Sequence, residues 1–401
     1  MFGIYITNMR VLWLLNPWWE SEDWERRDKH LVEYNSMKIR WFPGWLERIS
    51  LAPGSVNFVV GPRQVGKTTG LKILVRKLLS KIEESLQVLY MDLELFANLS
   101  EFREALLYYL NLREEERIKN SFIILDEVSS LPEWYRIVKG LIDLGKMKED
   151  IIIATGSSSV NILKHAESFA GRRGKGRDVY TLPLSFPEFV RVMKVDPRRE
   201  DRLIDAFQGY LIHGGFPKPI NGIFSEDDFI KAFERELTRI DKSVEMAKKI
   251  ISTSLDMLPS ALSYNSIAKK IGISHKTVES YLEVFQDLFI TKVIFYKSTD
   301  VIFRKEKKIM FRDPFIARSL ALWCGKELRR DILYENVVQE HMLRKFGEVY
   351  YYRNKYEIDC IAGDMKIEVK AGKPHRGYPK NVIVLEEKDI PKFLVEVFTH
   401  R

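Results

Sequence analysis

Between residues 56 and 184 the chain alternates short apolar runs with helix-length amphipathic stretches. The runs are rich in β-branched residues and read SVNFVV, LQVLYMDL, SFIILDE, DIIIATG and DVYTLPL. Strands that alternate with helices in this way usually pair in parallel and carry the helices on their faces. The pattern therefore predicts an α/β fold with a mostly parallel sheet, a core typical of nucleotide-binding proteins.

Beyond this region the pattern changes to long amphipathic helices. The charged stretch 195–203 contains Pro197, which suits a domain junction. We expect an N-terminal segment, 1–50, that packs on a nucleotide-binding core, 51–195. A helical domain, 196–300, and a mixed α/β domain, 301–401, would follow. In the first segment Trp18, Trp19 and Trp24 would either cover a base or pack on the core.

The motif GPRQVGKT, from Gly61 to Thr68, matches the phosphate-binding pattern G-x-x-x-x-G-K-[ST]. It follows the apolar strand 56–60 and opens the helical pattern 67–79, which is the context that this motif requires. Lys67 would reach the β- and γ-phosphates, and Thr68 would supply a hydroxyl ligand to Mg²⁺. We therefore predict ATP and Mg²⁺ as cofactors. The predicted nucleotide contacts are Gly61, Pro62, Arg63, Gln64, Val65, Gly66, Lys67, Thr68 and Thr69.

Two later strands end in polar residues. SFIILDEV, at 121–128, ends in Asp126 and Glu127. Downstream of a phosphate loop, Asp126 is expected to hold Mg²⁺ and Glu127 to polarise the attacking water, although paired acids also cap helices. IIIATGSSS, at 151–159, ends in hydroxyl groups. Ser157 or Ser158 would report the γ-phosphate as a sensor, or would cap the next helix.

The segment AGRRGKGRD places Arg172, Arg173 and Arg177 in a glycine-rich stretch that we expect to be mobile. A guanidinium on such a loop suits a catalytic arginine finger that acts on the same subunit or on a neighbour in a homo-oligomer. It equally suits a contact to a nucleic-acid backbone, or a solvated loop.

Taken together, GPRQVGKTT, LDEV, TGSSS and GRRGKGRDVYTLPLSFPEF resemble the AAA-type ATPases of archaea and bacteria that carry a C-terminal DUF4143 domain. The resemblance continues through YLIHGGFP, at 210–217, to the region that ends in KIEVKAG, and so covers almost the whole chain. It implies a P-loop AAA-type ATPase core. It also implies a C-terminal domain, 301–401, that is similar to the PD-(D/E)xK fold of restriction-endonuclease-like nucleases.

Residues 263–297 predict a helix-turn-helix followed by a strand. Gly272 suits the tight turn, and Ser274 suits the N-cap of the second helix. The strand ITKVIFYK would form the wing of a winged helix, with Lys276 and Thr277 facing a major groove or a phosphate. Winged helices in ATPases also serve as protein contacts, so DNA is one of two expected partners. The predicted inward face of the second helix is Val278, Tyr281, Leu282 and Phe285.

The stretch EIDCIAGDMKIEVKAG, at 357–372, predicts a hairpin whose two-residue turn is Gly363-Asp364, with glycine first as a type II′ turn prefers. Asp359 then lies opposite Glu368, and strand alternation places Lys370 on the same face. Like charges in opposite positions destabilise a hairpin by up to about 1 kcal/mol. A divalent metal between the two carboxylates would offset that repulsion.

The resembled nucleases suggest how these residues would act. Glu335, from the preceding helical pattern, would join Asp359 and Glu368 as ligands of Mg²⁺. Lys370 would position or deprotonate a water that attacks a phosphodiester. In the alternative interpretation Lys370 only neutralises the acids, and the domain contacts DNA or protein without cleaving it.

Charge and composition narrow the partners and the compartment. Residues 301–401 carry 21 Lys and Arg against 15 Asp and Glu, a net +6, whereas residues 201–300 carry 13 against 14, a net −1. This asymmetry favours DNA as a partner of the C-terminal domain, although a solvated charged surface would give the same count. Cys324 and Cys360 are the only cysteines, and the longest apolar run near the N-terminus, VLWLL, is too short to span a bilayer. We therefore expect a soluble cytoplasmic protein.

Two functions fit these observations. In the first, ATP hydrolysis controls a C-terminal domain that binds, and in one version cleaves, DNA. In the second, the chain is an ATP-driven conformational switch that assembles proteins, and the C-terminal domain is a non-catalytic interaction platform. Salt-dependent DNA binding separates the two, because contacts to phosphate weaken steeply as salt rises.

Overall fold

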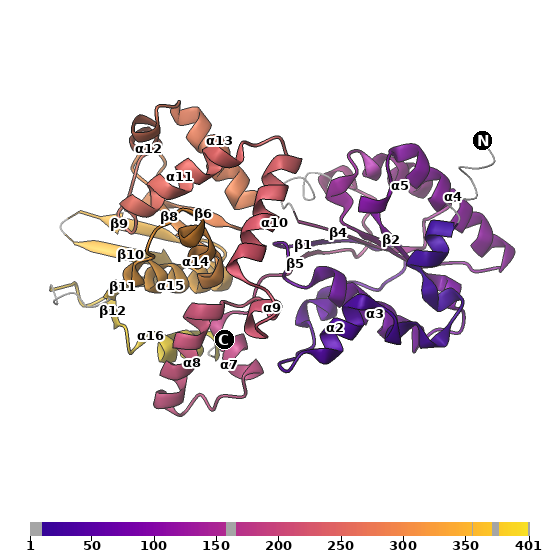
Figure 1. Cartoon of the computed structure of the whole chain (residues 1–401), viewed down its shortest axis with the longest axis horizontal. Coiled ribbons are helices and arrows are strands. Elements are labelled where there is room, and N and C mark those ends of the chain that lie inside the picture. The colour runs from indigo at the N-terminus through magenta and orange to yellow at the C-terminus, as the bar shows by residue number, and fades with distance from the viewer. Residues whose placement is uncertain (1–9, 158–165, 355, 371–376, 400–401) are drawn as a thin grey trace. The chain divides into compact units, whose positions relative to one another are not determined.

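The computed structural model describes residues 10–157, 166–354, 356–370 and 377–399 (Figure 1). Its contacts divide the chain into two units, which meet in sequence between Leu182 and Pro183. This boundary precedes the junction expected at 195–203. The reason is that α7 (Phe186–Val192) packs on α8 (Glu200–His213) and on α16 (Ile390–Thr399), all in the second unit.

The first unit is built on a five-stranded sheet with the order β2-β3-β4-β1-β5. Every neighbouring pair in this sheet is parallel, which confirms the predicted α/β fold. The central strands are buried along their whole length, as expected for a sheet that carries helices on both faces. The strands are β1 (Val56–Val60), β2 (Val88–Asp92), β3 (Phe122–Asp126), β4 (Ile151–Gly156) and β5 (Asp178–Tyr180).

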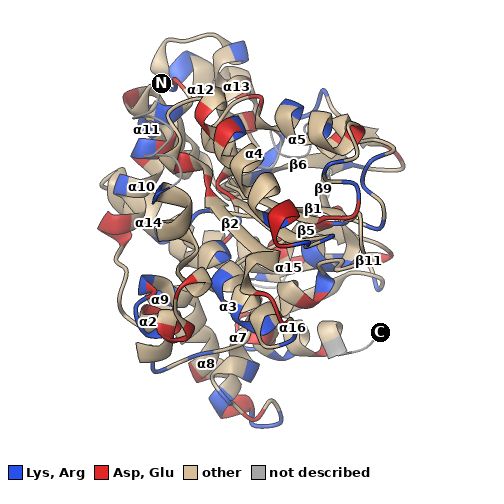
Figure 2. Cartoon of the chain, turned by 90° about the vertical axis from the view of Figure 1, so that its right-hand side faces the viewer, with Lys and Arg blue, Asp and Glu red and all other residues tan. Residues whose placement is uncertain are grey.

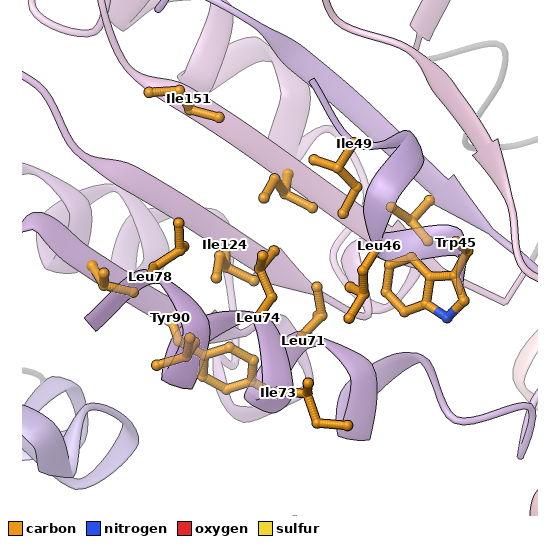
Figure 3. Close-up of a cluster of buried hydrophobic side chains, with 14 of the residues drawn as sticks. Trp45, Leu46, Ile49, Leu71, Ile73, Leu74, Leu78, Tyr90, Ile124 and Ile151 are labelled. Atoms are coloured by element: carbon orange, nitrogen blue, oxygen red, sulfur yellow. The ribbon is translucent and has the colours of Figure 1, made fainter. Parts of the chain in front are cut away.

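The helix that follows β1 supplies one wall of the core. Leu71 and Leu74 of this helix point toward Ile124 of the sheet on one side, and Leu46 closes the cluster on the other (Figure 3). All four side chains are at most one-twentieth exposed. The helices of the unit are α2 (Lys29–Ser36), α3 (Lys67–Leu79), α4 (Leu99–Glu115) and α5 (Trp134–Asp143), with short 3-10 turns that include η3 (Gly44–Arg48) and η5 (Leu93–Leu95).

Residues 10–49 cover the edge strand β2. Asn16 accepts a hydrogen bond from the backbone N–H of Tyr90 (2.6 Å) and donates to its carbonyl (2.9 Å). The indole N–H groups of Trp18 and Trp19 both donate to the carbonyl of Val88 at 3.0 Å. These bonds satisfy an otherwise open sheet edge. Trp18 and Trp24 also belong to the hydrophobic core of the unit, so the tryptophans take the packing role rather than that of an exposed base cover.

The second unit contains a seven-stranded mixed sheet with the path β12-β11-β10-β9-β6-β7, to which β8 adds by pairing with β6. None of the helices in the described parts of the chain is long and apolar enough to cross a membrane. The strands are β6 (Thr291–Lys297), β7 (Val301–Ile302), β8 (Lys308–Phe311), β9 (Tyr350–Arg353), β10 (Glu357–Ala362), β11 (Met365–Lys370) and β12 (Ile383–Glu386). The helices not yet named are α9 (Pro217–Ile220), α10 (Glu226–Arg239), α11 (Val244–Met257), α12 (Tyr264–Ile271), α13 (His275–Asp287), α14 (Pro314–Trp323) and α15 (Arg330–Phe346).

Helices α12 and α13 adopt the predicted helix-turn-helix. Gly272 ends α12 in the left-handed region, with φ 73°, and the Ser274 hydroxyl accepts from Thr277 N at the start of α13. The antiparallel pair β6–β8 follows, and Leu262, just before α12, makes a bridge to Lys307. The buried residues of α13 are the four that the sequence predicts, Val278, Tyr281, Leu282 and Phe285.

The hairpin β10–β11 has the predicted register. Cys360 pairs with Ile367, and Ala362 pairs with Met365, on either side of the Gly363-Asp364 turn. Gly363 has φ 54°, and Asp364 is not among the residues of positive φ, as a type II′ turn requires. The register therefore brings Asp359 and Glu368 to opposite positions. Helix α15 lies against β8, β10 and β11, and so carries Glu335 toward the same sheet.

Candidate functional site

The phosphate loop lies between β1 and α3. Gly66 begins the helix with φ 93°, a conformation that side chains with a Cβ rarely adopt. Lys67, the first residue of α3, is buried, and its ammonium donates to the carbonyls of Gly61 (2.9 Å) and Pro62 (3.0 Å). The ammonium is thus held over the loop whose backbone N–H groups would surround a phosphate. Nearby, Arg63 pairs with Glu94 at 3.4 Å.

Asp126, at the carboxyl end of β3, is fixed by its two neighbouring strands. Its Oδ2 accepts from the hydroxyl of Tyr90 on β2 at 2.9 Å. Its Oδ1 accepts from the hydroxyl of Thr155 on β4 and from the backbone N–H of Glu127, the latter at 3.1 Å. The carboxylate is buried, with 1% exposure. These bonds fix the carboxylate at the sheet edge where the phosphate loop lies.

Glu127 has the environment of a reactive carboxylate. It takes φ 48°, in the left-handed region, where a residue with a side chain is strained. Its Oε2 is buried and has no hydrogen-bond partner among the described residues. Burial raises the pKa of Glu127, the Lys67 ammonium opposes that rise, and the Asp126 carboxylate adds to it. A strained, raised-pKa carboxylate with one open oxygen is suited to accept a proton from a bound water.

Thr155 is a site residue that the sequence interpretation missed. The register of β3 and β4 pairs Leu125 with Ala154, so the next residues, Asp126 and Thr155, lie side by side. The signal was present in the sequence as a hydroxyl before the glycine of IIIATG, in a strand that is otherwise apolar. Ser157 is buried two residues further on, near the same sheet edge, and its sensor role stays a prediction. Ser158 lies outside the described residues.

The basic loop is packed on the sheet rather than mobile. The carbonyls of Arg173 and Arg177 accept from Val56 N (3.1 Å) and Phe58 N (2.9 Å), beside the first half of β1. A Cβ on Gly176 would lie 1.9 Å from the carbonyl of Val56, so the glycine is explained by close backbone contact. The phosphate loop follows the other end of β1. A finger from this loop would therefore act on another copy and not on its own subunit.

Two of the three arginines of this loop are held by acids. Arg172 makes two bonds to the carboxylate of Asp143, at 2.6 and 3.1 Å. Arg173 pairs with Asp178 at 2.7 Å. Arg177 is exposed and has no ion pair among the described residues. Of the three candidates, Arg177 is the one whose guanidinium is available to another molecule.

In the second unit, the predicted acids gather around a lysine that the sequence interpretation missed. The Lys308 ammonium lies 2.7 Å from Asp359 Oδ1, 2.9 Å from Glu335 Oε1 and 3.1 Å from Glu357 Oε1. Lys308 is only 2% exposed. The three carboxylates raise its pKa well above the usual lysine value, although burial acts in the opposite direction. Lys308 therefore balances the negative charge that the sequence interpretation assigned to a metal. No spacing pattern could reveal it, because it lies 51 residues before Asp359.

Glu368 and Lys370 form a second part of this cluster. As strand alternation predicts, the Lys370 ammonium donates to Glu368 Oε1, which also accepts from the hydroxyl of Tyr378 at 2.9 Å. Burial raises the pKa of Glu368 to about 7, the nearby Asp359 carboxylate adds to the rise, and Lys370 opposes it.

The cluster does not fit a divalent metal. Asp359 Oδ2 accepts from Val369 N at 3.0 Å, so both oxygens of Asp359 are already engaged. Glu335 Oε1 holds Lys308 and also accepts from Gln339 at 2.9 Å. Among the predicted ligand atoms of the described residues, Glu368 Oε2 is the one that is buried and has no hydrogen-bond partner. Mg²⁺ needs several oxygen ligands at once. Within the described parts of the chain no group of His, Cys, Asp and Glu side chains is arranged to hold a metal ion.

The parallel sheet, the phosphate loop and the acid pair at the end of β3 define a P-loop ATPase core. Comparison with protein families specifies it further, because residues 54–190 match the family described as AAA domain. The first unit is therefore similar to AAA domains over residues 54–190. Residues 204–327 match a different family, described as domain of unknown function DUF8612. The prediction of a DUF4143 domain was therefore wrong. The motifs behind that resemblance lie mostly in the ATPase part and do not specify the domain that follows.

Solved structures give only a weak likeness. The ORC2 protein of Aeropyrum pernix, in ADPNP and ADP complexes, shares 13% identity and a TM-score of 0.40, over 68% of this chain and 89% of its own. The ORC1 protein of the same organism, in complex with DNA, has 11% identity and a TM-score of 0.33, with 67% of this chain and 86% of its own covered. Cdc6p of Pyrobaculum aerophilum has 16% identity and a TM-score of 0.28, with 68% of this chain and 88% of its own covered. TM-scores this low do not establish a shared fold. No curated protein matches the chain.

The Lys308 cluster makes a prediction about stability. Lys308→Met should lower the free energy of unfolding by about 3–5 kcal/mol, because it leaves buried carboxylates without their cation. Thermal or urea unfolding of the full chain would measure this loss. Lys366→Met, a half-buried lysine on β11 without an ion pair among the described residues, is the matched control and should change stability by about 0.5 kcal/mol or less.

The same unfolding experiment tests whether the Lys308 cluster binds a divalent metal. Without nucleotide, and with the Lys67→Ala change to weaken the ATPase site, Mg²⁺ or Mn²⁺ should leave the midpoint of unfolding unchanged, because only binding to the folded state would shift it. A rise in the midpoint that Asp359→Asn abolishes would contradict this interpretation and restore the metal-site hypothesis.

Proposed function

We propose that the chain is an ATP-hydrolysing switch whose nucleotide state controls the association of its second unit with DNA. The observation that carries the hydrolytic part is Glu127, whose carboxylate lies near Lys67 and has a buried oxygen without a hydrogen-bond partner among the described residues. In this proposal the Lys67 ammonium leaves the loop carbonyls to bind the β- and γ-phosphates of ATP. Glu127 accepts a proton from the attacking water.

The residues of the site fit the cation that accompanies ATP. Thr68, in the first turn of α3, and Asp126, at the end of β3, would hold Mg²⁺, which would neutralise charge on the phosphates. The hydrogen bonds from Tyr90 and Thr155 orient Asp126 for this role. Thr155 on β4 and Ser157 just after this strand would relate the state of the γ-phosphate to Asp126 and Glu127. The backbone N–H of Glu127 lies 3.3 Å from the Thr155 hydroxyl, which provides such a connection.

Substitutions separate nucleotide binding from hydrolysis. Lys67→Ala should abolish both, because the phosphates lose their main cation. Glu127→Gln should retain ATP binding and lower kcat by about 100- to 10,000-fold, because the general base is removed. Binding of a fluorescent ATP analogue and phosphate release would measure the two effects. Glu149→Gln, an exposed acid of the same unit, is the control. Normal turnover in Glu127→Gln would remove Glu127 from this role.

Arg177 is the proposed finger, supplied to the site of a second copy. ATPase activity per molecule should then rise with protein concentration. Arg177→Ala and Lys67→Ala proteins, each inactive alone, should recover activity on mixing, because a mixed pair contains one complete site. Arg172→Ala, whose guanidinium is held by Asp143, should show a smaller loss. Activity that is independent of concentration, with no recovery on mixing, would count against action on a neighbour.

For the DNA-binding part, the support is a helix-turn-helix followed by a β-hairpin, the order of elements in a winged helix. Lys276 at the start of α13 is exposed, as are Arg304 and Lys305 in the loop between β7 and β8. None of these three has an ion pair among the described residues. Exposed cations at the start of α13 and in the loop between β7 and β8 support the proposal, because they could contact the phosphates of a duplex.

The affinity for duplex DNA should fall steeply between about 50 and 200 mM salt, with a log–log slope of about −0.9 for each phosphate contact. Lys276→Ala should weaken binding and reduce the slope by about one contact. Lys231→Ala, an exposed lysine of α10, is the control and should leave the slope unchanged. Fluorescence anisotropy measures both quantities. The absence of binding at low salt would favour the second function, a switch that assembles proteins.

Cleavage of DNA is not part of this proposal. Lys308 is bound to two of the three predicted metal ligands, and Lys370 is bound to the third. The second unit therefore acts as a nucleic-acid or protein platform. If the chain instead assembles proteins, the Lys308 cluster would serve only to hold α15 on the sheet.

A further inference from the structure

Four tyrosines form a continuous strip on the second unit. The ring of Tyr296, on β6, stacks on Tyr352 of β9, with centroids 5.7 Å apart and planes at 28°. Tyr352 contacts Tyr356 at 5.5 Å, and Tyr356 contacts Tyr378 at 6.3 Å. The strip therefore runs from the β6–β7 hairpin to the Glu368–Lys370 pair, whose carboxylate accepts from the hydroxyl of Tyr378.

These rings are not explained by the packing of the core. All four are half-buried at the surface, whereas Tyr351, which alternates with Tyr352 along β9, is 2% exposed. Among the described residues, the hydroxyls of Tyr296, Tyr352 and Tyr356 have no hydrogen-bond partner. Tyrosine is common at interfaces because it offers a partner both an apolar ring and a hydroxyl. The strip is thus an aromatic surface that retains binding capacity.

A cation lies near each end of the strip. The Lys305 ammonium lies 5.8 Å from the ring centroid of Tyr296, and the Lys370 ammonium lies 5.3 Å from that of Tyr378. Lys305 is exposed and has no ion pair within the described residues. The strands labelled β9 and β11 in Figure 2 carry this blue colour of Lys and Arg.

Lys370 is paired with Glu368, so the free positive charge of the strip is that of Lys305. Glu357, which follows Tyr356, is bound to Lys308 at 3.1 Å. The surface thus combines a row of aromatic rings with an unpaired cation. This combination matches a partner that has flat aromatic groups at regular intervals along a negatively charged backbone.

We propose that the tyrosine strip binds single-stranded nucleic acid, with bases stacked on Tyr296, Tyr352 and Tyr356 and a backbone phosphate next to Lys305. A duplex cannot bind in this way, because its bases are already stacked inside the helix and do not reach a protein ring. This inference rests on the proposed DNA association. It refines that association by assigning duplex to the α12–α13 surface and single strands to the strip.

Fluorescence anisotropy of the full chain with labelled oligothymidine and oligouridine tests the assignment. Tyr352→Ala should weaken binding of both probes by about tenfold or more, since each stacked base contributes on the order of 1–3 kcal/mol. Tyr352→Phe keeps the ring and should bind as well as wild type. Tyr108→Ala, a half-buried tyrosine of α4, is the matched control. ATP hydrolysis without nucleic acid should be the same in all of these proteins.

Duplex DNA, measured in parallel, distinguishes this inference from the proposed function. The expected result is that Tyr352→Ala loses single-strand binding and keeps duplex binding. Single-strand binding that is equal in wild type and in both Tyr352→Ala and Tyr296→Ala would overturn the inference and leave the strip to a protein partner, with DNA association intact. Failure to bind either a duplex or a single strand would overturn both proposals.

Discussion

The position of Asp126 is the constraint on which the nucleotide site depends. Its carboxylate is held by a hydroxyl from each neighbouring strand, Tyr90 on β2 and Thr155 on β4. Because the strands are parallel and in register, the three side chains meet at one edge of the sheet, where the phosphate loop also emerges from β1. A shift of either flanking strand would move a ligand of the proposed cation site and would also alter the backbone of Glu127.

Residues of the N-terminal segment help to fix Tyr90, and through it Asp126. The ammonium of Lys72, on α3, lies 3.5 Å from the ring centroid of Tyr90 and 3.7 Å from a carboxylate oxygen of Asp28. Burial lowers the pKa of Lys72 to about 8, and Asp28 limits the fall. Asn16 meanwhile fixes the backbone of Tyr90 on the other side. Residues 10–49 are therefore part of the first unit, because they hold Tyr90, which in turn holds Asp126.

The second unit uses similar residue types for a different purpose. Glu335 and Asp359 converge as metal ligands would, yet the charge they concentrate is balanced by Lys308 from β8. A buried carboxylate needs a cation but does not specify which one. The surface of the unit, in contrast, keeps cations that have no acid partner among the described residues, at the start of α13 and in the loop between β7 and β8. This contrast favours a binding role over a hydrolytic role for the second unit.

Local patterns in the sequence determined the strands of the ATPase core, the phosphate loop, the helix-turn-helix and the register of the β10–β11 hairpin. Each of these depends on residues that are close in the chain: an apolar run that ends in glycine, a serine N-cap, a glycine-first turn. The local pattern also determined that Asp359 and Glu368 lie opposite each other, because a two-residue turn fixes which residues of a hairpin face each other.

Only the tertiary structure decided what the charged residues of these elements do. Lys308 reaches Asp359 from a distant strand, Thr155 meets Asp126 through strand pairing, and the arginine loop lies at the end of β1 opposite the phosphate loop. A lysine, a threonine or an arginine has the same local signature whether it binds a ligand or balances a neighbour. Its role is set by the charge and the polar groups that folding brings within a few ångströms of it, and these come from segments that the local pattern does not connect.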